Sequence, residues 1–108
     1  MLRFKIGTNQ RGDACWWLYA ANNELVAWSG ESFASLANAR RAASAFRAGA
    51  ATARYDVYLD NANCWRWRAW RSSDKVASSG QSFSSQQSAE RAAANVRDNA
   101  GSATGAAA

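Results

Sequence analysis

The chain has 108 residues, a net charge of +5 and a hydrophobic fraction of 48%. Alanine supplies 26 of its apolar residues, and the 13 aromatic residues outnumber the 11 Leu, Ile, Val and Met. No stretch approaches the roughly 20 apolar residues that cross a bilayer, and the chain has no His, the commonest general base and metal ligand. The composition therefore predicts one basic domain without a membrane segment, whose core packs rings on small alanine surfaces.

The charge and the cysteines suggest where the protein acts and on what. An isoelectric point near 9.9 favours an anionic partner, either nucleic acid or an acidic protein. The first residues, 1–6, lack the apolar run of a secretory signal, so we expect a cytoplasmic protein. In that compartment Cys15 and Cys64 should remain free thiols.

Three strands and a helix are predicted in the first half of the chain. Phe4 and Ile6 alternate with polar neighbours, which indicates a strand, and residues 15–20 and 25–29 form two more after turns at 8–13 and 22–23. Ser35 can cap a helix. The helix would bury one face, made of Leu36, Ala39, Ala43 and Phe46.

The second half predicts the same order of elements. Strands are expected at 54–59, 65–70 and 75–79, with turns at 60–63 and 72–74. Ser85 would cap a helix whose buried face holds Gln86, Ala89, Ala93 and Val96. The last residues, 101–108, are small and polar, and we expect a disordered tail there.

The two halves also match each other in sequence. The block Val-Ala-x-Ser-Gly-x-Ser-Phe-x-Ser begins at Val26 and again at Val76, and the offset of 50 extends back to pair Trp17 with Trp67. Upstream the offset is 51, which predicts a first turn one residue shorter in the second copy. We therefore expect an α+β domain of two βββα repeats, 1–50 and 51–100. A pseudo-twofold axis would relate the repeats in one antiparallel-rich sheet with both helices packed on one face.

Several of these motifs resemble the YegP family of short tandem-repeat domains. The resemblance rests on the Cys64-Trp-Arg-Trp-Arg strand, the Val76-Ala-Ser-Ser-Gly segment and the Ser82-Phe-Ser-Ser helix entry, and it covers residues 3–100. The first half departs from the family pattern where Trp16 and Leu18 replace two arginines. The resemblance implies the repeat fold and no established biochemical activity.

The period of two along each strand predicts which side chains face the helices. On this parity the inward set is Phe4, Ile6, Trp17, Tyr19, Tyr55, Val57, Trp65, Trp67 and Ala69. The outer face would then carry an anion or nucleic-acid surface of Arg3, Lys5, Arg54, Tyr58, Arg66, Arg68, Trp70 and Lys75. At three equivalent strand positions its second half would be basic, with Arg66, Arg68 and Lys75. In the other half it would be apolar, with a self-association patch of Trp16, Leu18 and Leu25.

Two functions follow as alternatives. A basic face carrying rings suits single-stranded nucleic acid, because cations neutralise phosphates and rings stack on bases; Trp16, Tyr58 and Trp70 would be the stacking rings. An exposed apolar patch instead favours a homodimerising structural or assembly protein. The carboxylates form neither a paired site nor a nucleophile and base arrangement, so we expect no enzyme, no metal and no cofactor.

Overall fold

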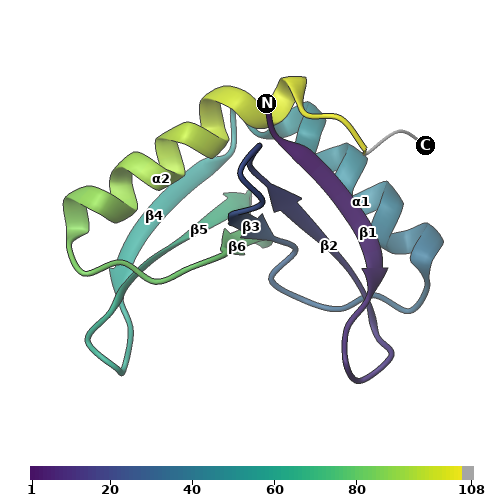
Figure 1. Cartoon of the computed structure of the whole chain (residues 1–108), viewed down its shortest axis with the longest axis horizontal. Helices are drawn as coiled ribbons and strands as arrows, with labels where there is room; N and C mark the ends of the chain where they lie inside the picture. Colours follow the sequence, from purple (N-terminus) through teal and green to yellow (C-terminus); the bar gives the residue numbers. More distant parts are fainter. Residues whose placement is uncertain (106–108) are drawn as a thin grey trace.

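The computed structural model describes residues 1–105 as two layers, an antiparallel sheet and two helices (Figure 1). The strands are β1 (Arg3–Thr8), β2 (Ala14–Tyr19), β3 (Leu25–Trp28), β4 (Arg54–Leu59), β5 (Trp65–Arg71) and β6 (Asp74–Ser79). The helices are α1 (Leu36–Gly49) and α2 (Gln86–Asn99), and a single 3-10 turn, η1 (Ala100–Ser102), follows α2.

The six strands form one sheet in the order β1-β2-β3-β6-β5-β4. The short central pair β3 and β6 joins the two halves through Ala27 opposite Ser79 and Trp28 opposite Ser78. Helix α1 lies against β1 and β2, and α2 lies against β4 and β5. In Figure 1 both helices lie in the upper part of the view, and the β1–β2 and β4–β5 turns lie at its lower edge. The α+β class, the antiparallel sheet and the two helices agree with the prediction.

Both helices begin where the sequence predicts. The Ser35 hydroxyl accepts a hydrogen bond from the backbone N–H of Asn38 at 3.1 Å, and the Ser85 hydroxyl accepts one from Ser88 at 3.1 Å. The predicted inner faces are also buried, through Ala39, Ala43 and Phe46 in α1 and Ala89, Ala93 and Val96 in α2. The first position of each face was predicted wrongly, since Leu36 is 45% exposed and Gln86 is exposed. At this first helical position, directly after the cap, the side chain of each helix still lies at the surface.

Two fully buried tryptophans fill the space between the sheet and the alanine-rich helices. Trp16 stacks on Phe46 of α1 with ring centroids 5.2 Å apart and meets Phe4 edge-on at 5.3 Å. Trp67 is equally buried, and its ring centroid lies 5.7 Å from that of Tyr55. Small alanines on the helices therefore make room for large rings on the strands, as the composition predicts.

The predicted inward face of β2 is wrong. Trp16 and Leu18 are fully buried and pair with Ile6 and Phe4, whereas Trp17 and Tyr19 are half-buried on the opposite face. In the second half the prediction is correct, because Trp67 and Ala69 are buried opposite Val57 and Tyr55. The structural counterpart of Trp67 is therefore Trp16, and the identity of Trp17 with Trp67 is misleading.

The reason lies in the lengths of the turns. In the β1–β2 turn, the Asn9 side chain accepts hydrogen bonds from the backbone N–H groups of Arg11 and Asp13. In the β4–β5 turn, the Asp60 side chain accepts them from Ala62 and Cys64. These turns have equal length, so the expected shortening of the first turn is wrong. The missing residue is in the next turn. Residues 21–23 lie between Ala20 and Glu24, which are hydrogen-bonded to each other, whereas only Ser72 and Ser73 lie between the paired Arg71 and Asp74. The offset of 51 therefore continues through β2, and one residue of difference reverses its faces.

The end of the described chain is also ordered differently from the prediction. Thr104 forms a parallel β-bridge with Arg3. The Thr104 carbonyl accepts a hydrogen bond from the backbone N–H of Phe4 at 2.7 Å, and the Thr104 N–H donates one to the Leu2 carbonyl. Ala103 is fully buried in the core. For residues 101–105 the prediction of a disordered tail is therefore wrong, because these contacts cover the edge of β1. The rest of that predicted tail, 106–108, lies outside the described residues.

Two further expectations can be compared with the described residues. Cys15 and Cys64 are free thiols, as predicted; Cys15 is buried and Cys64 lies in the β4–β5 turn. Within residues 1–105, neither helix combines the length and the apolar character that crossing a membrane requires.

Candidate functional site

The sheet face opposite the helices carries a continuous row of polar and aromatic side chains. Directly paired residues of neighbouring strands project on the same face. The pairings therefore align one residue from each strand, in the order Lys5, Trp17, Trp28, Ser78, Arg68 and Asp56. A second line of pairs adds Arg3 with Tyr19 in one half and Arg54 with Trp70 in the other. We call this surface the open face.

In the second half of the open face, two of the cations, Arg66 and Arg68, are held by carboxylates. The Arg66 guanidinium lies 2.7 Å from the Asp60 carboxylate, and Arg68 lies 3.5 Å from Asp56. Asp56 also accepts the indole N–H of Trp70 at 2.6 Å. A bound anion would therefore compete with existing partners at both arginines.

The rings of this half are covered as well. The Arg68 guanidinium lies 3.9 Å from the ring centroid of Tyr58 and 5.6 Å from that of Trp70, and Arg54 lies 5.6 Å from Trp70. Arg68 thus joins two rings and a carboxylate in one cluster. Its Nε is buried and has no partner among the described residues.

The Asp60 carboxylate accepts hydrogen bonds from the backbone N–H groups of Ala62 and Cys64 and from the Arg66 side chain. The backbone N–H of Cys64 and then the Arg66 side chain stabilise its charged form and lower the pKa of Asp60 below its usual value. A carboxyl with a lowered pKa stays ionised at neutral pH and holds no proton to donate as a general acid.

The first half of the open face has a different chemistry at the same positions. The equal first turns make Lys5 the counterpart of Asp56 and Asn9 the counterpart of Asp60. Both carboxylates of the second half are therefore replaced, one by a cation and one by an amide. Among residues 1–105, Lys5 has no ion-pair partner, while Arg3 lies 5.4 Å from the ring centroid of Tyr19 and donates to the carbonyl of Ala20.

Two tryptophans in this half present free rings. Trp17 and Trp28 are half-buried, and within the described chain no guanidinium or second ring lies over either of them. A shallow depression of about 790 Å³ lies beside Trp17, lined by Lys5, Gly7, Thr8, Asn9, Gln10, Trp17 and Tyr19. Gly7 leaves the Trp17 ring uncovered on this side, since a Cβ there would meet the ring at 3.5 Å, in ordinary van der Waals contact.

The predicted basic surface lies on the open face, while the predicted apolar patch does not exist as a surface. The strand pairings put the following on one face: Arg3, Lys5, Arg54, Tyr58, Arg66, Arg68, Trp70 and Lys75. Trp16 and Leu18 are fully buried, and Leu25 is half-buried beside a sheet bulge, so the self-association patch and the role of Trp16 as a stacking ring were predicted wrongly.

Sequence reasoning missed Trp17, Tyr19 and Trp28. The first two were assigned inward because Trp17 was aligned with Trp67. The turn residues held a better signal. At an offset of 51, Asn9 corresponds to Asp60 and Gly12 corresponds to Asn63. Gly12 and Asn63 adopt the left-handed backbone, with φ of 84° and 63°.

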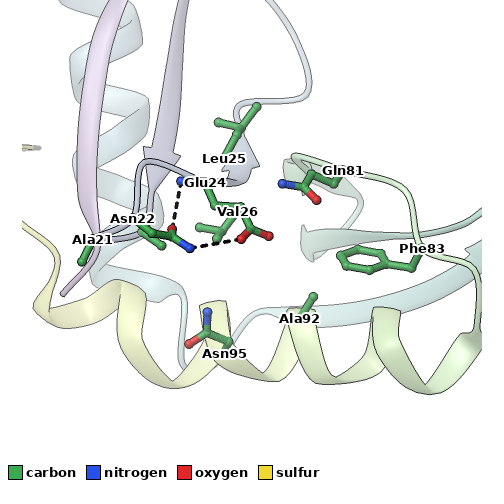
Figure 2. Close-up of a pocket in the computed structure, with 10 residues that line it drawn as sticks. Ala21, Asn22, Glu24, Leu25, Val26, Gln81, Phe83, Ala92 and Asn95 are labelled. Atoms are coloured by element: carbon green, nitrogen blue, oxygen red, sulfur yellow. Dashed lines mark hydrogen bonds between the residues drawn. The ribbon is translucent and has the colours of Figure 1, made fainter.

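A hollow outside the open face lies between the β2–β3 turn and α2 (Figure 2). This pocket, of about 400 Å³, has an apolar floor of Val26, Phe83 and Ala92, and Asn95 of α2 lies at its rim. At its mouth Asn22 donates to the Glu24 carboxylate at 3.4 Å. Its lining includes one carboxylate and no Lys or Arg, so it does not suit an anion.

A metal site would need several ligands close together. Over the described range 1–105, no three of the Cys, Asp and Glu side chains come together in a group that could hold a metal ion.

Comparisons with known proteins identify the fold. No family model matches the chain, and no curated protein sequence matches it. Two solved structures share its architecture. The solution NMR structure of a UPF0339 protein from Shewanella oneidensis has a TM-score of 0.79 at 15% identity, over 96% of this chain and 89% of that one. The solution NMR structure of yegP from E. coli, a protein of unknown function, has a TM-score of 0.79 at 22% identity, over 95% and 89%.

These neighbours support the resemblance to the YegP family at the level of the fold. The yegP structure is described as that of a protein of unknown function, so the likeness brings no activity with it.

Proposed function

We propose that this chain is a non-catalytic, YegP-like tandem-repeat module whose open face binds single-stranded nucleic acid. The observation that carries the proposal is the row of side chains across the six strands, in which Lys5 and Arg68 flank the rings of Trp17 and Trp28. Both features of a single strand, its phosphates and its base faces, have complementary groups in this row.

The repeat organisation is part of this proposal. Each half has three strands and a helix, a serine at the helix N-cap and a buried serine at the end of its third strand, Ser29 or Ser79. The halves meet at the antiparallel β3–β6 pair, where a pseudo-twofold axis would pass. Two repeats related in this way would present one unbroken face long enough for several nucleotides.

The energetics of such a surface are well defined. Each phosphate neutralised by a cation releases counterions, so affinity falls as salt rises. Stacking of one base on an aromatic side chain contributes about 1 to 3 kcal/mol and depends little on sequence. A face with free cations and free rings is therefore suited to single strands of many sequences.

A binding role accounts for the polar groups better than catalysis does. The chain has no His, and the carboxylates of the open face, Asp56 and Asp60, are bonded to arginines and an indole rather than to each other. The two free thiols favour a reducing, cytoplasmic location.

A charge-reversal experiment tests the proposal. The double variant Lys5→Glu with Arg68→Glu reverses one cation in each half of the open face. The matched control, Arg40→Glu with Arg41→Glu, makes the same charge change on exposed positions of α1. Binding of a fluorescent oligothymidylate is measured by anisotropy at 50 and 200 mM salt. The face variant should lose binding while the control retains most of it, and wild-type binding should weaken at higher salt.

Three outcomes would contradict the proposal. The first is no binding by the wild-type protein at low salt, and the second is an equal loss in both variants. The third is displacement of the oligonucleotide by polyglutamate at equal charge, which would identify a general polyanion or acidic-protein surface without base stacking.

A further inference from the structure

We infer that bases stack on the first half of the open face, in the depression beside Trp17, and that the second half contributes mainly charge. This inference rests on the proposed function and assigns its base-contacting residues. The base subsite consists of Trp17, Trp28 and the depression lined by Gly7, with Lys5 and Arg3 beside it for the phosphates.

The first argument is the availability of ring faces. Tyr58 and Trp70 are covered by guanidinium groups, and the Trp70 indole N–H is already donated to Asp56. A base stacking there would have to displace these groups. Among the described residues, nothing of this kind lies over Trp17 or Trp28, so a base can stack on them without breaking a contact within the protein.

The second argument is the availability of charge. The face has two cations in the first half, Arg3 and Lys5, and no carboxylate pairs with either of them in the described chain. In the second half, Arg66 and Arg68 are paired with Asp60 and Asp56, while Arg54 and Lys75 have no carboxylate partner among the described residues. Although the summed charges of the two halves are similar, the Lys5 ammonium can meet a phosphate without first losing an ionic partner.

The third argument is shape. Gly7 is the only residue of β1 without a side chain, and the ring of Trp17 lies across that position from the neighbouring strand. Thr8 and Gln10, both exposed, also line the depression. A flat aromatic ligand flanked by phosphates fits this combination of a ring wall, an open floor and a nearby ammonium.

Two substitutions test the inference at the subsite. Trp17→Ala removes the stacking ring, and Gly7→Leu fills the depression while keeping the ring. Each should weaken oligothymidylate binding by about 5- to 150-fold, the effect of losing one stacked base. Trp70→Ala should cause a smaller loss than Trp17→Ala. The control Gly101→Leu adds the same side chain at an exposed site near the end of α2, where a Cβ would meet nothing closer than 3.8 Å, and it should bind as the wild type does.

Thermal melts confirm that each variant is folded before binding is measured. The inference is overturned if Trp17→Ala and Gly7→Leu bind like the wild type, or if Trp70→Ala loses more than either. In both cases the proposed function survives, provided that the charge-reversal variant still loses binding. No binding by the wild type would instead overturn the proposed function together with this inference.

Discussion

Two adjacent tryptophans of β2 should differ sharply in their contribution to stability. Trp16 is fully buried between the sheet and α1, stacked on Phe46, whereas Trp17 is half-buried on the open face. A buried aromatic side chain removes about 200 Å² from water, which at about 25 cal/mol per Å² corresponds to about 5 kcal/mol. Alanine retains a small part of that burial, so Trp16→Ala should cost about 3 to 5 kcal/mol.

Trp17→Ala leaves no closed cavity and should cost about 1 kcal/mol. Urea unfolding followed by circular dichroism measures both losses. Because Trp16→Ala removes a large share of the roughly 5 to 15 kcal/mol typical of a domain, Trp16→Phe provides a milder variant that keeps a ring against Phe46. The reasoning is refuted if Trp17→Ala destabilises the protein as much as Trp16→Ala, or if Trp16→Phe costs less than Trp17→Ala.

Two further predictions concern a close approach and a titrating group. A Cβ on Gly80 would lie 2.5 Å from the backbone carbonyl oxygen of Leu25, so Gly80→Ala should lower the free energy of unfolding in urea by about 1 to 3 kcal/mol. A Cβ on Gly7 has its nearest contact at 3.5 Å, so Gly7→Ala should change that free energy by less than about 0.5 kcal/mol. Equal effects of the two substitutions would contradict this prediction. Because the folded-state pKa of Asp60 is lowered, its stabilising contribution is present above the unfolded-state pKa and is lost as pH falls through the folded-state pKa. As pH falls below about 4, the melting temperature of Asp60→Asn should therefore decrease less than that of the wild type. Asn9 fills the equivalent turn position and makes the same backbone bonds, so the variant turn should remain intact; an unchanged pH profile would refute the role of Asp60.

The elements and their caps could be predicted from sequence because local chemistry specifies them. Ser35 and Ser85 precede amphipathic segments, and both act as caps in the structure. The alanines at 39, 43, 89 and 93 recur at helical spacing and are all buried. Each of these signals lies within one element and needs no knowledge of its neighbours.

The faces of β2 were harder to predict because both parities are apolar. Its sequence, Ala-Cys-Trp-Trp-Leu-Tyr, offers a large side chain to either side. Only the register with β1, fixed by the turn that Asn9 bonds, decides that Trp16 faces the helices. In β5, the alternation of Trp with Arg removes the ambiguity, and there the prediction was correct.

The candidate surface was therefore predicted in part. Arginines on β5 and cations on β1 lie on the open face as expected, since charged side chains seldom face a core. The pairing of Arg68 with Asp56 and its position over Tyr58 depend on neighbouring strands, and strand order cannot be read from local sequence. For that reason the free rings of the first half became visible only in the structure.

The most direct test of the account follows the six tryptophan indole N–H signals by NMR during titration with oligothymidylate. The signals of Trp17 and Trp28, on the open face, should shift strongly with added single strand. Those of Trp16 and Trp67, fully buried beneath the helices, should stay nearly unchanged. Unmoved Trp17 and Trp28 signals, whether the other indole signals shift or not, would contradict the claim that the open face binds single-stranded nucleic acid.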